Sequence, residues 1–471
     1  MDEAYLIDTS STKRQFLTRE DVSNRNDLCC GDYKMNTLSS QPYKGARDYY
    51  PEDKRVQNYI FSVWHKISKS FGYEEYGAPT LEPLEVYVAK SGQELVNEQT
   101  YTFTDRGGRV VAIRPEMTPS VSRMVAGRRQ ELAYPARLYS IANFMRYERP
   151  QRGREREFWQ LNVDIFGSDG VSAEAEIITL SDSIMKEFGA KPEDYVIKIN
   201  NRKLINFMMA QYLGLDATQA QLMVKLFDRK DKISEKDFTD QASEIFGDWS
   251  EVGLKKVETL LSAKTMADLP AEIRDSSSVR EVQELFTLLE RADVRSLSFD
   301  ITLMRGLDYY TGMVFEVRDT HPENNRSMFG GGRYDGLVGV FGVEPISAVG
   351  VAPGGTTMEN FLTVHNLLPK LQSTTDVYIA ALGEVSREAG KLARDLREKG
   401  INVELDLSDR KLDKQLKNVF KKGIPYILFI GEEEVRTGIY ALKDINNSQD
   451  FKLDFAGVVG KLTVRHSPYN E

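Results

Sequence analysis

The chain has 471 residues, of which 41% are hydrophobic and 28% charged, a composition typical of a folded protein of roughly two to four domains. No apolar run approaches the ~20 residues that a membrane-spanning helix needs, and the first residues lack the pattern of a secretory signal, so we expect a cytoplasmic protein with no membrane partner. A net charge of −9 excludes non-specific wrapping of nucleic acid by the whole surface. Two cysteines and four scattered histidines predict no metal site.

The N-terminal part of the chain changes from a polar leader to regular structure. Residues 1–40 show no sustained hydrophobic period, which predicts a flexible leader. A helix is predicted from Pro51 to Phe71, because proline and acidic residues stand at its start and apolar residues recur at helical spacing. Residues 74–82 then predict a short strand broken by proline.

Further strands are predicted at 101–103, 110–113 and 138–141, each bounded by Gly, Asp or Pro. Runs of strands without regular helix alternation favour a mostly antiparallel sheet, so we predict an α+β fold. Residues 203–292 carry Leu, Met, Lys and Glu at helical spacing, which predicts a helical insertion between two halves of the sheet domain, 41–202 and 293–365.

The C-terminal part follows a predicted linker at 366–375 and reads as a separate domain, 376–471. Apolar strands alternate there with helices that end at glycines. The strands are predicted at 377–381, 401–405 and 426–431, and the helices at 384–399 and 411–422. This order indicates a small α/β domain with a largely parallel sheet at its centre.

The densest charged segment, 144–167, consists of two predicted strands around a loop rich in arginine. A guanidinium can pair bidentately with phosphate, and an aromatic face can stack on a purine. Gln160 and Asp164 lie four residues apart on the outgoing strand and therefore face the same side.

Residues 304–312, Met-Arg-Gly-Leu-Asp-Tyr-Tyr-Thr-Gly, place a guanidinium, a carboxylate and two phenols within six positions. The next residues, 313–317, alternate in the β manner and predict a strand. Arg305 and Tyr310 would then project from a rigid edge. Such groups suit a small polar ligand that lies beside a phosphate.

These segments resemble the signatures of the histidyl-tRNA synthetase family of class II aminoacyl-tRNA synthetases. Residues 304–312 resemble the histidine-binding signature, 144–167 resemble the second class II motif, and the helix and strand over 51–82 resemble the first, a dimer-interface element. The resemblance covers about residues 41–465. It implies a catalytic domain on an antiparallel sheet, a helical insertion near the tRNA acceptor stem, a C-terminal α/β anticodon-binding domain and a homodimer.

The resemblance implies that the protein activates L-histidine with ATP and Mg²⁺, without a dedicated protein metal site, and transfers it to the 3′ end of tRNA(His). Arg146 and Arg305 would oppose each other across the α-phosphate as the catalytic pair, because fixed cations stabilise the charge that develops there. ATP would also contact Glu148, Arg156 and Phe158. No general base is needed, since the histidine carboxylate is already ionised.

The same resemblance implies a histidine pocket, in which carboxylates accept from the ammonium and an imidazole nitrogen. Its implied residues are Glu116, Thr118, Gln160, Asp164, Arg305, Tyr309, Tyr310 and Tyr334. Arg149 and Arg152 are implied contacts to the tRNA acceptor end. Lys414 and Lys417 lie in a basic run over 410–422; such a run is more commonly a solvated helix face, but in an anticodon-binding domain it favours tRNA contact.

The chain departs from the family in the third class II motif, G-x-G-x-[ED]-R. Residues 348–359 place Thr357 where the arginine is expected, and threonine supplies neither a cation nor a flat guanidinium. Either another cation replaces it, with Arg154, Arg156 and Arg333 as candidates, or ATP binding is weaker.

That departure keeps open an alternative, a non-catalytic paralogue such as the regulatory subunit of ATP phosphoribosyltransferase. Such paralogues usually lack the terminal domain and the arginine equivalent to Arg305, and this chain has both.

Overall fold

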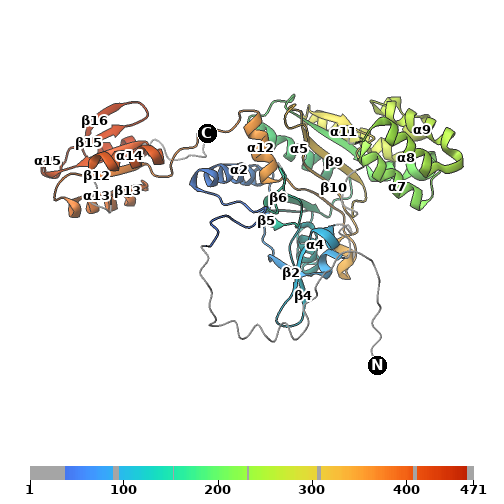
Figure 1. The fold of residues 1–471 in the computed structure, drawn as a ribbon, viewed down its shortest axis with the longest axis horizontal. Helices are drawn as coiled ribbons and strands as arrows, with labels where there is room; N and C mark the ends of the chain where they lie inside the picture. The colour runs from blue at the N-terminus through green and yellow to red at the C-terminus, as the bar shows by residue number, and fades with distance from the viewer. Residues whose placement is uncertain are drawn as a thin grey trace. The chain divides into compact units, whose positions relative to one another are not determined.

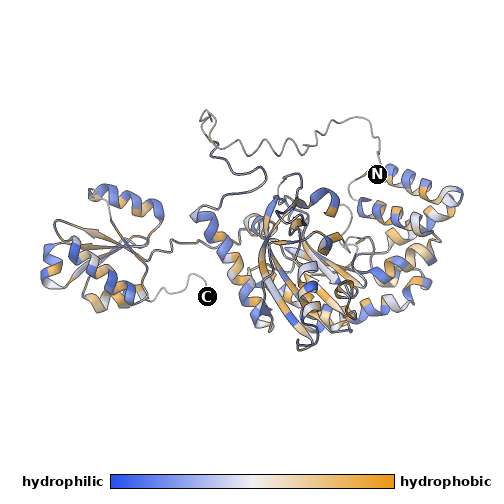
Figure 2. Cartoon of the chain, turned by 90° about the horizontal axis from the view of Figure 1, so that it is seen from below, coloured by the Kyte–Doolittle hydropathy of each residue, from blue (hydrophilic) through white to orange (hydrophobic). Residues whose placement is uncertain are grey.

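The computed structural model describes residues 38–88, 95–151, 153–230, 233–304, 309–406 and 411–463 (Figure 1). Within these ranges, no helix is both long and apolar enough to cross a membrane. In Figure 2 the hydrophobic residues concentrate on the strands and on the inner faces of the helices, as expected when each element buries one face.

An eight-stranded sheet forms the centre of the larger domain, in the order β1-β5-β6-β11-β10-β9-β7-β8. All of its pairs are antiparallel except β1–β5 and β7–β8, at the two edges. The predicted antiparallel sheet is confirmed. The strands are β1 (Glu74–Glu75), β5 (Ala136–Met145), β6 (Glu157–Phe166), β7 (Tyr195–Asn201), β8 (Leu297–Phe299), β9 (Met313–Asp319), β10 (Ser327–Arg333) and β11 (Ala348–Val351).

Three helices cover this sheet: α2 (Pro51–Ser70), α5 (Ser172–Glu187) and α12 (Gly355–Val364). Helix α2 contacts both α5 and α12, which in turn contact β11 and β6 (Figure 1). The predicted helix at 51–71 is confirmed as α2, which begins at a proline, has acidic residues in its first turn and buries Ile60, Val63 and Trp64. Its apolar face helps to form the core beneath the sheet.

A smaller three-stranded antiparallel sheet has the order β2-β4-β3, with β2 (Leu81–Pro83), β3 (Tyr101–Thr104) and β4 (Val110–Ile113). The strand predicted over 74–82, broken by proline, is divided between the two sheets. Glu74–Glu75 joins the large sheet, whereas Leu81–Pro83 joins the small one. Pro79 lies between them, and because proline has no N–H to donate, a continuous ladder ends there. Near this sheet in sequence are α3 (Glu85–Val88), the π-helix η2 (Leu95–Gln99) and α4 (Thr118–Gly127).

The region between β7 and β8 is helical, as the sequence predicts. It contains α6 (Arg202–Phe207), η3 (Met208–Tyr212), α7 (Ala217–Asp228), α8 (Glu235–Phe246), η5 (Gly247–Trp249), α9 (Ser250–Ser262), η6 (Met266–Asp268), α10 (Ala271–Arg274) and α11 (Ser277–Arg291). The last helix, α11, packs against α5 and β7. The helical region therefore shares its hydrophobic core with the sheet domain.

The C-terminal domain has a five-stranded sheet in the order β13-β12-β14-β15-β16. Its strands are β12 (Val377–Ala381), β13 (Val403–Leu405), β14 (Tyr426–Ile430), β15 (Tyr440–Asp444) and β16 (Gln449–Leu453). Strand β12 is parallel to both of its neighbours, so the predicted parallel centre is confirmed. The antiparallel extension by β15 and β16 was not predicted. The helices are α13 (Ser386–Glu398), α14 (Leu412–Lys422), α15 (Glu432–Thr437) and α16 (Phe455–Thr463).

Candidate active site

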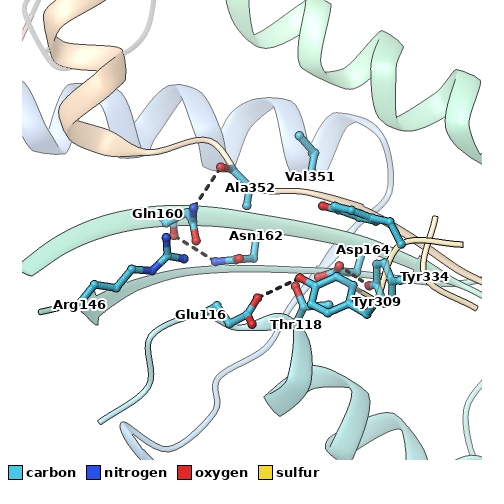
Figure 3. A pocket seen from close by; sticks show the side chains of 12 residues that line it. Glu116, Thr118, Arg146, Gln160, Asn162, Asp164, Tyr309, Tyr334, Val351 and Ala352 are labelled. Carbon is cyan, nitrogen blue, oxygen red and sulfur yellow. Dashed lines mark hydrogen bonds between the residues drawn. The ribbon is translucent and has the colours of Figure 1, made fainter. Parts of the chain in front are cut away.

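A pocket lies on the central sheet where β6 and β11 run side by side (Figure 3). The cavity has a volume of about 80 Å³. The lining residues are Glu116, Thr118, Arg146, Gln160, Asn162, Asp164, Tyr309, Tyr310, Tyr334, Gly350, Val351 and Ala352. The resemblance implied eight residues for the histidine pocket and Arg146 for the α-phosphate. Arg305 lies outside the described residues, and the other eight all line this pocket.

The strand geometry explains this gathering. Gln160, Asn162 and Asp164 alternate along β6 and therefore project from the same face of the sheet. On β11, Gly350 is paired with Asp164, and a Cβ at Gly350 would lie 2.1 Å from the Asp164 Oδ1. Only glycine therefore allows the two strands to pair while the carboxylate occupies the pocket.

Asp164 is the most unusual ionisable group of the pocket. It is 3% exposed, and its Oδ1 accepts a 2.5 Å hydrogen bond from the Tyr334 hydroxyl. The other carboxylate oxygen, Oδ2, is buried without a hydrogen-bond partner among the described residues. Burial raises the pKa of Asp164 to about 7, against the lowering effect of the Tyr334 hydrogen bond. A buried acceptor of this kind fits a ligand that brings its own N–H donor.

Glu116 and three tyrosines form the rest of the polar floor. The Tyr309 hydroxyl donates to the Glu116 Oε2 at 2.9 Å. The Tyr309 ring packs edge-on against Tyr310 and Tyr334, with centroid distances of 5.2 and 5.7 Å. Burial raises the pKa of each of these phenols, so they remain neutral. Thr118 begins α4 next to Glu116 and also lines the pocket.

Arg146 stands at the opposite end of the pocket from Asp164 and the tyrosines (Figure 3). Its Nε donates to the Pro115 carbonyl at 2.8 Å, and its guanidinium lies 5.2 Å from the centroid of the Phe158 ring. These two contacts fix the direction of the guanidinium while its terminal nitrogens stay near the pocket. Glu148 is the nearest carboxylate in an ion pair with it, at 4.0 Å. The pocket thus has a cationic end and an acceptor-rich end.

The remaining implied ATP contacts lie on the hairpin that joins β5 and β6. Arg156 stacks over the Tyr147 ring at 4.1 Å and donates from Nε to the Glu148 carbonyl at 3.1 Å. The Phe158 ring lies 5.8 Å from the Phe144 ring in a tilted arrangement. Phe158 lies at the start of β6, close to Arg146 at the cationic end of the pocket.

Several predicted residues lie outside the pocket or outside the described residues. Arg305 and Arg152 lie outside the described residues, so the predicted opposition of Arg146 and Arg305 stays a prediction. Arg149 is exposed on the hairpin. Lys414 and Lys417 are exposed on α14.

Asn162 is one of the pocket residues that the sequence reasoning missed. It is 2% exposed and lies on β6 between Gln160 and Asp164. The period of two that placed those residues on one face also places Asn162 there, so the signal was present. The β11 residues Gly350–Ala352 were missed for a different reason. They form a wall largely with backbone, and the Ala352 carbonyl accepts a 3.1 Å hydrogen bond from the Gln160 Nε2.

The structure corrects one proposed replacement for the motif 3 arginine. Arg333 is 6% exposed and makes a bidentate ion pair with Glu174, with both N–O distances 2.6 Å. It also donates to Asp335 at 3.2 Å. A guanidinium held in this way is part of the core, so Arg333 does not serve as a nucleotide-binding cation. Thr357, at the motif position, lies on the first turn of α12, and its Oγ1 is 2.9 Å from the Met328 carbonyl and 3.0 Å from that of Gly354.

Comparison with known sequences decides the family. The sequence model described as histidyl-tRNA synthetase matches residues 45–354, which is more than half of the chain, and the model of the anticodon-binding domain matches residues 376–465. The chain belongs to the histidyl-tRNA synthetase family. Members of this family include a histidine–tRNA ligase of Leptospira biflexa, 40% identical to this chain over 91% of its length and 98% of the relative's. Another, from Haloarcula marismortui, is 34% identical over 88% of this chain and 96% of the relative.

Solved structures of the family share the fold. The histidyl-tRNA synthetase of Nostoc sp. PCC 7120 superposes with a TM-score of 0.78 at 23% identity, covering 91% of this chain and 100% of the other. A Bacillus halodurans structure described as an ATP phosphoribosyltransferase regulatory subunit/histidyl-tRNA synthetase gives 0.70 at 23% identity, covering 84% and 99%. At these identities the likeness concerns the fold, which both branches of the family share.

Proposed function

We propose that this protein is a histidine–tRNA ligase, which activates L-histidine with ATP and transfers it to the 3′ end of tRNA(His). The observation that carries the proposal is the pocket itself, in which the buried Oδ2 of Asp164, which has no hydrogen-bond partner among the described residues, lies across from the guanidinium of Arg146. One end thus offers acceptors for an amino acid, and the other offers a cation for a phosphate. Relatives at 34–40% identity that carry the ligase name support it.

In this proposal the acceptor-rich end binds histidine. Asp164 accepts a hydrogen bond from one imidazole nitrogen, and Glu116, with Thr118 and Gln160, receives the α-ammonium. Tyr309, Tyr310 and Tyr334 close the pocket around the ring. An analogue without the imidazole N–H groups would leave the buried Asp164 oxygen unpaired, which is a strong basis for rejecting apolar amino acids.

Activation would occur at the cationic end. The histidine carboxylate attacks the α-phosphorus of ATP, a new O–P bond forms, and pyrophosphate leaves with the electrons of the broken P–O bond. Arg146 and Arg305 stabilise the charge on the α-phosphate, and the contacts of Arg146 to Pro115 and Phe158 hold it in place before ATP binds. Mg²⁺ bound with ATP neutralises the β- and γ-phosphates. Glu148, Arg156 and Phe158 bind the adenosine side.

In the second step the terminal ribose hydroxyl of the tRNA attacks the adenylate carbonyl, and AMP leaves. Arg149 and Arg152 are the proposed contacts to the acceptor end. Helix α14 presents exposed Lys414 and Lys417 next to Phe420, whose side chain is 60% exposed. Cations beside an exposed aromatic ring suit single-stranded RNA, because bases stack on the ring while phosphates pair with the cations. We assign anticodon binding to this surface.

The proposed sites also indicate the domain organisation of the chain. We propose a leader (1–40), a catalytic domain in two parts (41–202 and 293–365), a helical insertion (203–292), a linker (366–375) and an anticodon-binding domain (376–471). The protein would act as a cytoplasmic homodimer. Exposed apolar residues on one face of the small sheet, Leu81 and Phe103, support a partner surface there.

The non-catalytic regulatory subunit is the less supported alternative, because the chain matches the anticodon-binding model over residues 376–465. Histidine-dependent exchange of labelled pyrophosphate into ATP, followed by charging of tRNA(His), separates the two. A ligase catalyses both reactions. Histidine binding without exchange would favour the regulatory role and overturn the proposal.

A further inference from the structure

Two buried polar atoms of the sheet domain have no hydrogen-bond partner among the described residues. One is the Oδ2 of Asp164, which the proposed function assigns to the ligand. The other is the hydroxyl of Tyr76, which no step of that function uses. A buried polar atom without a partner costs free energy, and buried hydroxyls in proteins are nearly always hydrogen-bonded. Tyr76 is therefore a candidate for a role that the packing of its ring does not explain.

The strand register places Tyr76 on the pocket face of the central sheet. Just after β1, the Tyr76 N–H still donates to the Tyr139 carbonyl on β5 at 2.9 Å, so the ladder continues by one residue. Glu74 is opposite Leu138 on β5, and Leu138 is opposite Asp164 on β6. Opposite residues, and residues two apart in one strand, project from the same face of a sheet. Tyr76 therefore projects from the same face as Asp164.

The packing of the Tyr76 ring brings it to the same region. Tyr76 packs against the hydrophobic cluster that contains Tyr309 and Tyr334, two of the residues that line the pocket. Burial, and after it the negative charge of Asp164, raises the pKa of the Tyr76 phenol well above its usual range. The phenol is therefore neutral and able to donate a hydrogen bond, and it lies close enough to Asp164 for the carboxylate charge to act on it.

The surroundings of Asp164 leave room for a second donor. Tyr334 donates to Oδ1, whereas Oδ2 has two lone pairs and can accept from an imidazole N–H and from one further group at the same time. The titratable or charged side chains of the described residues that act on Asp164 or share its pocket are Tyr73 and Tyr76 on either side of β1, Tyr310 before β9, Tyr334 after β10, and Glu116 and Arg146 in the pocket.

We propose that Tyr76 is a positioning residue of the histidine pocket, whose hydroxyl donates through one buried water to the Asp164 Oδ2. No direct hydrogen bond joins the two groups in the structure, and a bridging water would supply both with a partner. A hydrogen bond donated to a carboxylate favours its ionised form. Tyr76 thereby keeps Asp164 ionised near neutral pH, so that its oxygen accepts from the imidazole N–H. The inference rests on the proposed function, because it specifies how the same pocket recognises the amino acid.

The test compares the dissociation constants of histidine for the wild type and Tyr76→Phe, by calorimetry on the full-length protein from about pH 6 to about pH 8.5. Tyr76→Phe keeps the ring but removes the donor, so the Asp164 pKa rises and the ionised acceptor is lost at a higher pH than in the wild type. Histidine should bind the variant about threefold to tenfold more weakly at about pH 6. It should bind both equally at about pH 8.5, where Asp164 is ionised in each. The titration of histidine itself cancels in the ratio of the two constants.

Tyr139→Phe is the matched control, because it removes a tyrosine hydroxyl on the opposite face of the sheet. The Tyr139 side chain belongs to the core on the helix side, and its hydroxyl contacts the His65 Nδ1 at 3.0 Å and the Glu75 Oε2 at 3.2 Å. The ratio of its histidine dissociation constant to that of the wild type should not vary with pH.

A second background determines whether Tyr76 acts through Asp164. In Asp164→Asn there is no carboxylate to titrate, so adding Tyr76→Phe should change histidine affinity by the same factor at every pH. A ratio for Tyr76→Phe alone that does not vary with pH, a pH-dependent loss of the same size in Tyr139→Phe, or a pH-dependent loss that persists in Asp164→Asn would each overturn the inference.

Failure of the proposed function has a different signature. A wild-type protein that binds no histidine, or that catalyses no histidine-dependent exchange of pyrophosphate into ATP, would overturn the proposed function and this inference with it. A ratio that does not vary with pH, in a wild-type protein that binds histidine and catalyses exchange, overturns the role of Tyr76 alone.

Discussion

Replacement of Asp164 by asparagine gives the sharpest test of the pocket. The side chain is 3% exposed, one carboxylate oxygen accepts from Tyr334, and the other has no partner among the described residues. Asparagine has nearly the same shape and still accepts from Tyr334, but it carries no charge. Asp164→Asn therefore removes the buried charge without creating a cavity.

The expected effect on stability has a definite sign. Folding raises the pKa of Asp164 from 3.8 to about 7 because the side chain is buried. The protonated acid therefore stabilises the folded state fully below pH 3.8, and this contribution is lost as the pH rises through about 7. At higher pH the ligand-free protein bears a buried carboxylate at a cost of about 4 kcal/mol, since each pKa unit corresponds to ~1.4 kcal/mol. Asp164→Asn avoids that cost.

Urea unfolding of the ligand-free protein, followed from about pH 5 to about pH 8, measures this difference. Asp164→Asn should be more stable than the wild type, by a margin that grows to about pH 7 and then levels off. Histidine binding should instead weaken about tenfold to a hundredfold, because a charge-assisted hydrogen bond is lost. Asp169→Asn, an exposed carboxylate shortly after β6, is the control and should change neither quantity.

The reasoning would be refuted if Asp164→Asn proved less stable than the wild type at about pH 8 without histidine. A stability difference that did not vary with pH would refute it equally. Either result would mean that Asp164 is a structural hydrogen-bonding group rather than a buried carboxylate that lowers stability and binds the ligand.

The other predictions concern the core, the chemistry and the tRNA surface. Arg333→Ala should lower the free energy of unfolding by about 3–5 kcal/mol, measured in urea, because it leaves the carboxylate partner buried and unpaired; a loss below about 1 kcal/mol would contradict the role assigned to the ion pair. Arg305→Ala should abolish adenylate formation while the circular dichroism spectrum is unchanged; near-normal pyrophosphate exchange would remove its assigned role. Lys414→Glu together with Lys417→Glu should abolish tRNA charging but preserve exchange, whereas Lys391→Glu, another exposed lysine of that domain, should spare both; normal charging in the double variant would exclude the α14 surface.

The spacing of apolar and polar residues within one segment predicts the helix or strand that this segment forms. The stripe of α2 follows from residues at helical spacing, and the strand at 377–381 is recovered with the bounds of β12. The pocket face of β6 follows from alternation alone, which is why Gln160 and Asp164 were found together. In each case, the neighbours that define the pattern lie within one helix or one strand.

Long-range packing decides what local pattern cannot. Residues 74–75 and 81–83 look like one strand, yet they join different sheets, because the partner strands are far away in the chain. The hairpin of β15 and β16 depends on an edge that β14 offers only after the domain has folded.

The sequence by itself determined the chemistry of this protein, namely the arginines, carboxylates and phenols of a synthetase site. It also showed that Thr357 stands where the third class II motif has an arginine. The tertiary structure decided which of those groups is available for that chemistry. It placed Arg333 in a buried ion pair with Glu174, away from that chemistry. A side chain's role depends on the partners within a few ångströms of it, and those partners are set by how distant segments pack.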